Sequence, residues 1–105
     1  MNVFIGTGRL TRNAVVNGEE RRVMTFTIAA KYGYDTEAEE DRVEFISCVM
    51  FNPPEKLQEY LAREGKGVLV EFRGRVANSS YEKDGETKYS TEIVVSNRSF
   101  NILTK

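Results

Sequence analysis

Alternation of apolar and polar side chains runs through most of this chain and constrains its fold more than any other feature. In the segment 23–30, Met24, Phe26 and Ile28 alternate with threonines, which is the pattern of a strand with one buried face. Similar extended runs cover residues 3–10, 43–51, 68–76, 89–95 and 100–103. The pattern predicts a β-protein with five or six strands.

A single segment departs from this alternation. Leu57, Tyr60 and Leu61 are spaced as on one face of a helix, and Gly65 suits its end. Asn52 is predicted to cap this helix, with Pro53 in its first turn.

The order of these elements defines the predicted fold class, which is all-β. A short helix between the third and fourth main strands, followed by a long β-hairpin turning at Asp84-Gly85, favours a five-stranded Greek-key barrel of the oligonucleotide/oligosaccharide-binding (OB) type. A length of 105 residues predicts one domain, residues 1–105. An SH3-like barrel and an open sandwich are the alternatives for the same elements.

The residue types argue against an enzyme. The chain has no histidine, which excludes a Ser-His-Asp triad and a His-ligated zinc site. Its one cysteine, Cys48, lies mid-strand among apolar neighbours and is interpreted as a small buried side chain. We therefore expect no catalytic residues, no metal and no cofactor, and a reduced compartment. No segment has the pattern of a membrane helix or a signal peptide.

Acidic residues are unevenly distributed. The formal net charge is −1, but six of the sixteen acidic residues lie between Asp35 and Glu44, where Arg42 is the only base. The rest of the chain carries fourteen bases and ten acids. We expect this window to form an acidic loop on a mildly basic body, which is compatible with a polyanionic ligand.

The strand predicted at 43–51 is apolar on both faces. Val43, Phe45, Val49 and Phe51 share one parity, and Ile46, Cys48 and Met50 share the other. Only one face can line a small barrel, so the other must be covered by a loop, a second subunit or a ligand.

Aromatic and basic side chains occur together in two places. Lys31, Tyr32 and Tyr34 follow one strand, and Tyr81, Lys83, Lys88 and Tyr89 lie on the long hairpin. Proteins that bind single strands combine positive charge with aromatic platforms, because every base presents a π face. These groups indicate a single-stranded nucleic-acid interface.

Five motifs, in order along the chain, resemble the bacterial single-stranded-DNA-binding protein family. They are Gly8-Arg9-Leu10-Thr11, Phe26-Thr27-Ile28-Ala29, the strand from Phe45 to Phe51, Arg73-Gly74-Arg75-Val76, and Tyr89-Ser90-Thr91-Glu92-Ile93-Val94-Val95. The resemblance implies an OB-fold that binds single-stranded DNA without sequence preference and protects exposed strands in DNA replication, recombination and repair. It also implies a homotetramer, or a dimer as in some relatives, in the bacterial cytoplasm and associated with the nucleoid, encoded by a chromosome, phage or plasmid.

The same resemblance implies a set of site residues. The aromatic positions on which bases stack correspond to Tyr34, Phe45, Phe51 and Tyr81. Basic side chains near these motifs are expected to contact phosphates: Arg9, Lys31, Arg73, Arg75, Lys83 and Lys88.

Departures from the family pattern lead to further expectations. The chain ends at Lys105 without the acidic tail that recruits replication proteins in full-length members, so we expect no such recruitment by this chain. Primosomal replication protein N, a similar dimeric OB-fold, is the alternative family, and it would make the aromatic face a protein-interaction surface. An RNA-binding barrel is a further alternative.

Overall fold

The computed structural model describes residues 1–104, which form six strands and one helix. In chain order the elements are β1 (Phe4–Leu10), β2 (Val15–Asn17), β3 (Val23–Asp35), β4 (Glu40–Phe51), α1 (Glu55–Glu64), β5 (Leu69–Lys83) and β6 (Glu86–Thr104). The helix therefore lies between the third and fourth long strands, as predicted.

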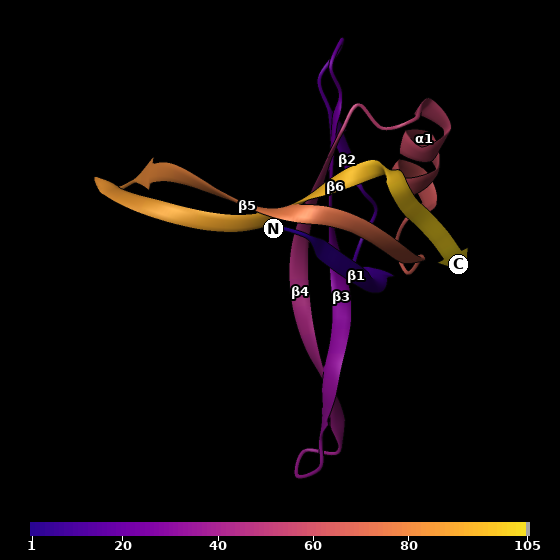
Figure 1. Ribbon diagram of the computed structural model, residues 1–105, viewed down its shortest axis with the longest axis vertical. Coiled ribbons are helices and arrows are strands. Elements are labelled where there is room, and N and C mark those ends of the chain that lie inside the picture. The colour runs from indigo at the N-terminus through magenta and orange to yellow at the C-terminus, as the bar shows by residue number, and fades with distance from the viewer. Residues whose placement is uncertain (105) are drawn as a thin grey trace.

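Five of the strands form a closed ring. Hydrogen bonds join them in the order β1-β5-β6-β4-β3, and a further pairing of β1 with β3 closes the ring (Figure 1). All neighbours are antiparallel except β4 and β6, which run parallel at Cys48 and Val49. The short β2 is a sixth strand that pairs with the first residues of β3, within the five or six strands that the pattern predicts and outside the predicted five-stranded barrel.

The core lies inside this ring and under the helix. The largest fully buried side chains come from β1, β3, β4, β5, the residue before β5, and α1: Leu10, Met24, Ile28, Met50, Leu61, Val68 and Val70. Strand β6 adds the nearly buried Ile93 and Val95. Four of the six phenylalanines join this core region through ring contacts, with Phe72 stacked on Phe4 and Phe100 and packed edge-on against Phe26. The other two, Phe45 and Phe51, lie outside it.

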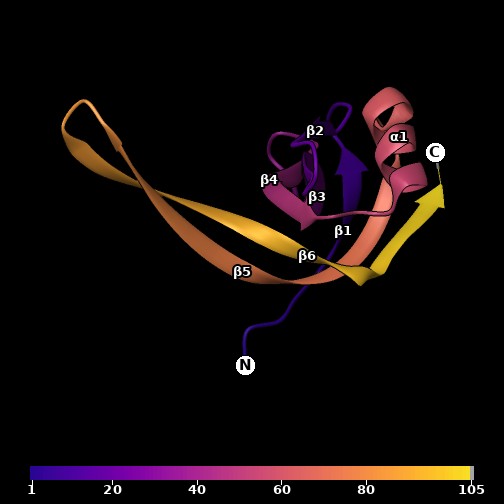
Figure 2. The same ribbon diagram turned by 90° about the horizontal axis from the view of Figure 1, so that it is seen from above.

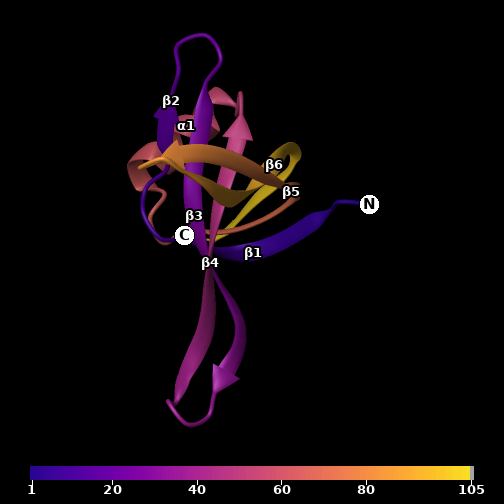
Figure 3. The same cartoon turned by 90° about the vertical axis from the view of Figure 1, so that its left-hand side faces the viewer.

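Two hairpins extend beyond the ring. The β3–β4 arm consists of residues 31–44, and the β5–β6 arm consists of residues 77–92. The two arms run crosswise in Figure 1, and Figure 3 shows the β3–β4 arm projecting away from the barrel on its own. Seen from above, the β5–β6 arm is a long curved and twisted ribbon (Figure 2).

The acidic window is not the loop that its composition predicted. Strand pairing continues to Asp35 and Glu40, so only residues 36–39 form the turn. The Asp35 carboxylate accepts hydrogen bonds from the backbone N–H groups of Glu37 and Ala38. Asp35 thus closes the turn locally, and the remaining acids lie on paired strands.

The predicted cap of the helix is also wrong. Pro54 occupies the N-cap position, and no side chain caps the helix. Asn52 instead adopts a positive φ of 48° and donates its backbone N–H to the Arg22 carbonyl, so it belongs to the turn leaving β4. Gly65 is the C-cap of the helix, as predicted, and the reason for a glycine is lack of space, because a Cβ there would clash with the Leu61 carbonyl oxygen.

Candidate nucleic-acid interface

The outer face of β4 carries the two phenylalanines that the core does not use. Phe45 is 69% exposed and Phe51 is 51% exposed, whereas Cys48 and Met50, of the opposite parity, are buried. Burial of a phenylalanine is normally favourable by about 1.5–3 kcal/mol, so two such rings left on one strand face are a distinctive feature. One side of β4 packs inward at Cys48 and Met50. On the other side Val49 is buried as well, so the exposed apolar surface consists of the two phenylalanine rings before and after it.

A row of paired residues connects Phe45 in β4, across β3, to β1 and β5. Arg9 in β1 pairs with Leu69 in β5 and with Ala29 in β3. Ala29 in turn pairs with Phe45 in β4. Residues paired in this way project to the same face of the sheet, so Arg9 and Phe45 lie on one surface.

A groove of about 460 Å³ crosses this surface. It is lined by Thr7, Gly8, Arg9, Ala29, Lys31, Val43 and Leu69. Gly8 permits the close approach of β1 to β3, because a Cβ there would lie 2.6 Å from the Ala29 carbonyl oxygen. The structure therefore brings two predicted phosphate contacts, Arg9 and Lys31, into one groove.

Both cations in the groove have partners within the chain. The Arg9 guanidinium donates a hydrogen bond of 2.8 Å to the Gly67 carbonyl, which fixes its direction. The Lys31 ammonium forms an ion pair of 3.0 Å with Asp41, with side chains 73% and 47% exposed. Because exposed ion pairs contribute at most about 1 kcal/mol, Lys31 remains available to a phosphate.

A β-bulge decides where Tyr34 points. The register of β3 against β4 shifts between Lys31 and Gly33, so Lys31 pairs with Val43 and Tyr34 pairs with Asp41. Asp41, Val43 and Phe45 alternate along β4 and share a face. Tyr34, which is 57% exposed, therefore lies on the same face as Lys31 and Phe45, although strict alternation along β3 would place it on the other.

The β5–β6 arm presents the other predicted aromatic. Tyr81 is 51% exposed and pairs with Lys88, and Lys83 pairs with Glu86 on the same ribbon face. Lys88 also forms an ion pair of 3.0 Å with Glu86. Tyr81, Lys83 and Lys88 are thus brought together at the end of the arm.

The structure does not bring Arg73 and Arg75 into the groove of Arg9 and Lys31. Arg73 lies at the register shift of β5 against β6 between Phe72 and Gly74, and Arg75 follows it. A Cβ at Gly74 would clash with the Val94 carbonyl oxygen. Arg73 pairs with Ile5 and borders two further grooves of about 300 and 420 Å³. Arg75 pairs with Val94 and borders the first of these.

Two exposed tyrosines belong to the aromatic and basic groups of the sequence but are not among the four predicted stacking positions. Tyr32 is 60% exposed within the bulge of β3, and Tyr89 is 77% exposed on the β5–β6 arm. Tyr89 lies inside the closing family motif, and the family resemblance assigned it no stacking position. Its neighbours Ser80, Ser90 and Lys88 are all polar and could have indicated that no core lies beneath it.

The remaining candidates for chemistry are poorly placed. Burial raises the pKa of the Cys48 thiol to about 12, so it stays protonated and unreactive near neutral pH. Residues 1–104 contain no group of three or more His, Cys, Asp or Glu side chains that could hold a metal.

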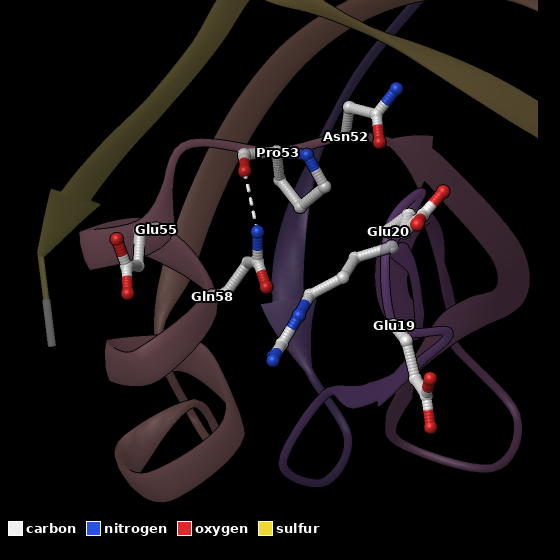
Figure 4. A pocket seen from close by; sticks show the side chains of 7 residues that line it. Glu19, Glu20, Asn52, Pro53, Glu55 and Gln58 are labelled. Atoms are coloured by element: carbon white, nitrogen blue, oxygen red, sulfur yellow. Dashed lines mark hydrogen bonds between the residues drawn. The ribbon is translucent and has the colours of Figure 1, made fainter.

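A polar cleft of about 310 Å³ lies beside α1 (Figure 4). Three glutamates, Glu19, Glu20 and Glu55, line it together with Arg22, and Gln58 donates a hydrogen bond of 2.6 Å to the Pro53 carbonyl at its wall. With three carboxylates against one guanidinium, this cleft suits a phosphate less well than the groove of Arg9 and Lys31 does.

Comparisons with known proteins place these features in context. The sequence model of the "Single-strand binding protein family" matches residues 1–101. A "Single-stranded DNA-binding protein 2" of Streptococcus agalactiae is 35% identical over 97% of this chain and 76% of its own length. A "Single-stranded DNA-binding protein" of Staphylococcus epidermidis is 27% identical over 90% of this chain and 72% of its own length.

The fold has a counterpart among solved structures. The chain superposes on Plasmodium falciparum SSB, in a complex with ssDNA, with a TM-score of 0.75 over 100% of this chain and 95% of the other. The two sequences are 17% identical, so this likeness concerns the fold, which is the predicted OB-fold. Within the described residues, α1 is neither long nor apolar enough to cross a membrane.

Proposed function

This chain belongs to the single-strand binding protein family, and from that premise we propose that it binds single-stranded DNA without sequence preference. In this proposal it coats and protects exposed strands during replication, recombination and repair, without catalysis. Its site of action is the exposed DNA of a bacterial cell, whether the gene is chromosomal or carried by a phage or plasmid.

The observation that carries the proposal is the open aromatic face of β4. Phe45 and Phe51 project from a strand whose other side is core, and Tyr34 joins them across the bulge. Unpaired bases can stack on such rings, and each stacked base contributes about 1–3 kcal/mol. Bases in a duplex are already stacked and cannot, so this face selects single strands.

Phosphate contacts complete the proposed site. Arg9 and Lys31 share the groove beside Phe45, and Lys83 and Lys88 flank Tyr81 on the arm. Arg73 and Arg75 lie on a different part of the ring, where they would meet a strand that continues past the groove. Neutralised phosphates release counterions, so binding should weaken as salt rises.

The proposal extends to a homo-oligomer, either a tetramer or a dimer. Strand β1 pairs with β5 from Phe4 to Arg9, but its other edge meets β3 only at Arg9 and Leu10. The open edge lies beside Val3 and Ile5, which are 50% and 68% exposed. A second copy would satisfy this edge, and sedimentation equilibrium would measure the number of copies.

A titration of intrinsic tyrosine fluorescence tests the main proposal. Oligo-dT, oligo-rU and duplex DNA are compared at two salt concentrations. The expected result is tight binding of oligo-dT, weaker binding of the duplex, and a loss of affinity with salt. Equal affinity for the duplex, or no response to oligo-dT, would contradict it, and preference for oligo-rU would favour an RNA-binding role.

A further inference from the structure

The β5–β6 arm carries an aromatic ring on each of its two faces. Tyr81 pairs with Lys88, and the adjacent pair along the ladder is Ser80 with Tyr89. Successive residues of a strand project to opposite faces, so Tyr81 and Tyr89 point to opposite sides of the ribbon. Tyr89 is 77% exposed, more than any other aromatic side chain among the described residues.

Ladder contacts fix this arrangement. The Ser79 and Ser90 hydroxyls are joined by a hydrogen bond of 2.8 Å on the face of Tyr81. On the face of Tyr89, Thr91 donates a hydrogen bond of 2.9 Å to Asn78. Pairing continues without a register shift from Ala77 to Lys83, so the face of each tyrosine is defined.

The surroundings of Tyr89 suit a nucleotide better than a protein. Its ribbon face consists of Asn78, Ser80, Glu82, Thr87 and Thr91, so the ring has no apolar neighbour on the arm. A stable protein interface needs a continuous apolar centre and about 800 Å² from each partner, which one ring among hydroxyls does not supply. A base needs one flat ring to stack on and nearby donors for its phosphate, which Ser80, Thr87 and the Asn78 amide can provide.

The edges of the arm are also open. Beyond the ring, β5 and β6 pair only with each other, with no third strand beside either one between Ala77 and Glu92. A flexible single strand can therefore pass round an edge of the ribbon from one face to the other (Figure 2).

We propose that Tyr89 is a second base-stacking platform, so that one bound strand contacts both faces of the β5–β6 arm. This inference rests on the proposed single-strand binding and adds a site to it. A strand long enough to pass round the arm uses both tyrosines, whereas a short one fills only the groove of the barrel.

Affinity for two strand lengths tests this inference. The Tyr89→Ala variant is compared with the unmodified chain on oligo-dT of about 6 and about 16 nucleotides, which spans the site sizes of OB-folds. We expect Y89A to weaken binding of the longer strand about five-fold or more and to leave the shorter one unchanged. Y89F, which keeps the ring, should match the unmodified chain on both.

The possible results distinguish failure of the second stacking platform from failure of the proposed single-strand binding. If the unmodified chain binds neither strand, the proposed function fails. If it binds both and Y89A binds the longer strand equally well, only the second platform is refuted. An equal loss on both strands would assign Tyr89 to the main groove and also overturn the inference. A changed molecular mass of Y89A in sedimentation, at unaltered affinity, would assign Tyr89 to a protein contact instead.

Photocrosslinking gives a readout that does not depend on affinity. Oligo-dT carrying 5-iododeoxyuridine at single positions crosslinks to aromatic rings in contact with it, and mass spectrometry identifies the peptide. The inference expects Tyr81 and Tyr89 to crosslink to different positions of one strand. Crosslinks to Tyr81 alone would overturn it.

Discussion

The two arms are built alike and differ in charge and regularity. The β3–β4 arm carries six acidic residues and two bases, contains a bulge, and ends in a four-residue turn at 36–39. The β5–β6 arm carries four acidic residues and two bases, keeps its register, and ends in a tight turn at Asp84 and Gly85. Both present an exposed tyrosine and a lysine on one face.

Because of this difference, we expect a tyrosine and a lysine on one arm to contribute differently to DNA binding from the same residue types on the other arm. On the β3–β4 arm, Tyr34 lies in a negative field that opposes a polyanion, and Lys31 is already paired with Asp41. Stacking there should contribute mainly where the barrel groove and Phe45 hold the strand in place. On the β5–β6 arm the field is weaker and hydroxyl groups predominate, so this arm can accept a strand on either face.

The largest expected effect is on the outer face of β4, where the β3–β4 arm joins the barrel. Phe45→Ala should weaken binding of oligo-dT by about 1–3 kcal/mol, because one stacked base is lost. Thermal unfolding should hardly change, since Phe45 is 69% exposed. Leu103→Ala, at an exposed apolar residue near the end of β6, is the matched control and should bind normally. Unfolding of Phe45→Ala would show that the ring is structural.

The next largest effect is expected from glycine substitutions, which should change the stability of the two arms differently. Gly85 has a φ of +79°, so Gly85→Ala should destabilise the tip of the β5–β6 arm by about 1–2 kcal/mol. Hydrogen exchange at residues 83–86 would measure this as faster exchange. Gly33→Ala in the β3–β4 arm should have little effect, because its φ is not positive and the nearest atom to a Cβ is 3.9 Å away. Equal effects would mean that the arms do not differ in this way.

Charge neutralisation tests the field of the β3–β4 arm. Replacing Glu37, Glu39 and Glu40 with glutamine should tighten binding by about 1 kcal/mol at low salt and hardly at high salt. Replacing Glu82 and Glu86 on the other arm should have a smaller effect. Fluorescence titrations at two salt concentrations would measure both, and a loss of affinity would indicate that the acidic arm makes a required contact.

The smallest effect concerns the ion pair beside the groove. Asp41→Asn frees Lys31 and should raise affinity by about 0.2–1 kcal/mol, with the salt dependence steeper by about one released ion. Stability should barely change, because both side chains are exposed. An unaltered salt dependence would mean that Lys31 does not meet a phosphate.

Much of the fold follows from local pattern. Met24, Phe26 and Ile28 have the parity that the core of a small barrel requires, and Leu57 and Leu61 have the spacing of one helical face. Asp84-Gly85 forms the hairpin turn that its sequence predicts, with positive φ at both residues. These features depend on a few neighbouring residues, so the sequence defines them.

The helix start and the acidic window were predicted less well, because composition does not specify pairing. Asn52 has the chemistry of a cap, but it lies two residues before the N-cap position at Pro54. The hydrogen bond from its backbone N–H to the Arg22 carbonyl, thirty residues earlier in the chain, holds it in the turn after β4. The acids Glu40, Asp41 and Glu44 suggest a solvated loop, but the segment that carries them is paired with β3. In both places a distant segment competes successfully for the backbone groups.

The sequence by itself determined which side chains can form the interface: aromatic rings and bases outside the core pattern. Only the tertiary structure decided which of them share a surface. Tyr34 joins Phe45 because the bulge between Lys31 and Gly33 adds one residue to β3, and one extra residue reverses the face of every side chain beyond it. Arg9 joins both because β1 closes the ring against β3. Strand register and ring closure are set by long-range backbone hydrogen bonds, and a pattern read along one strand does not contain them.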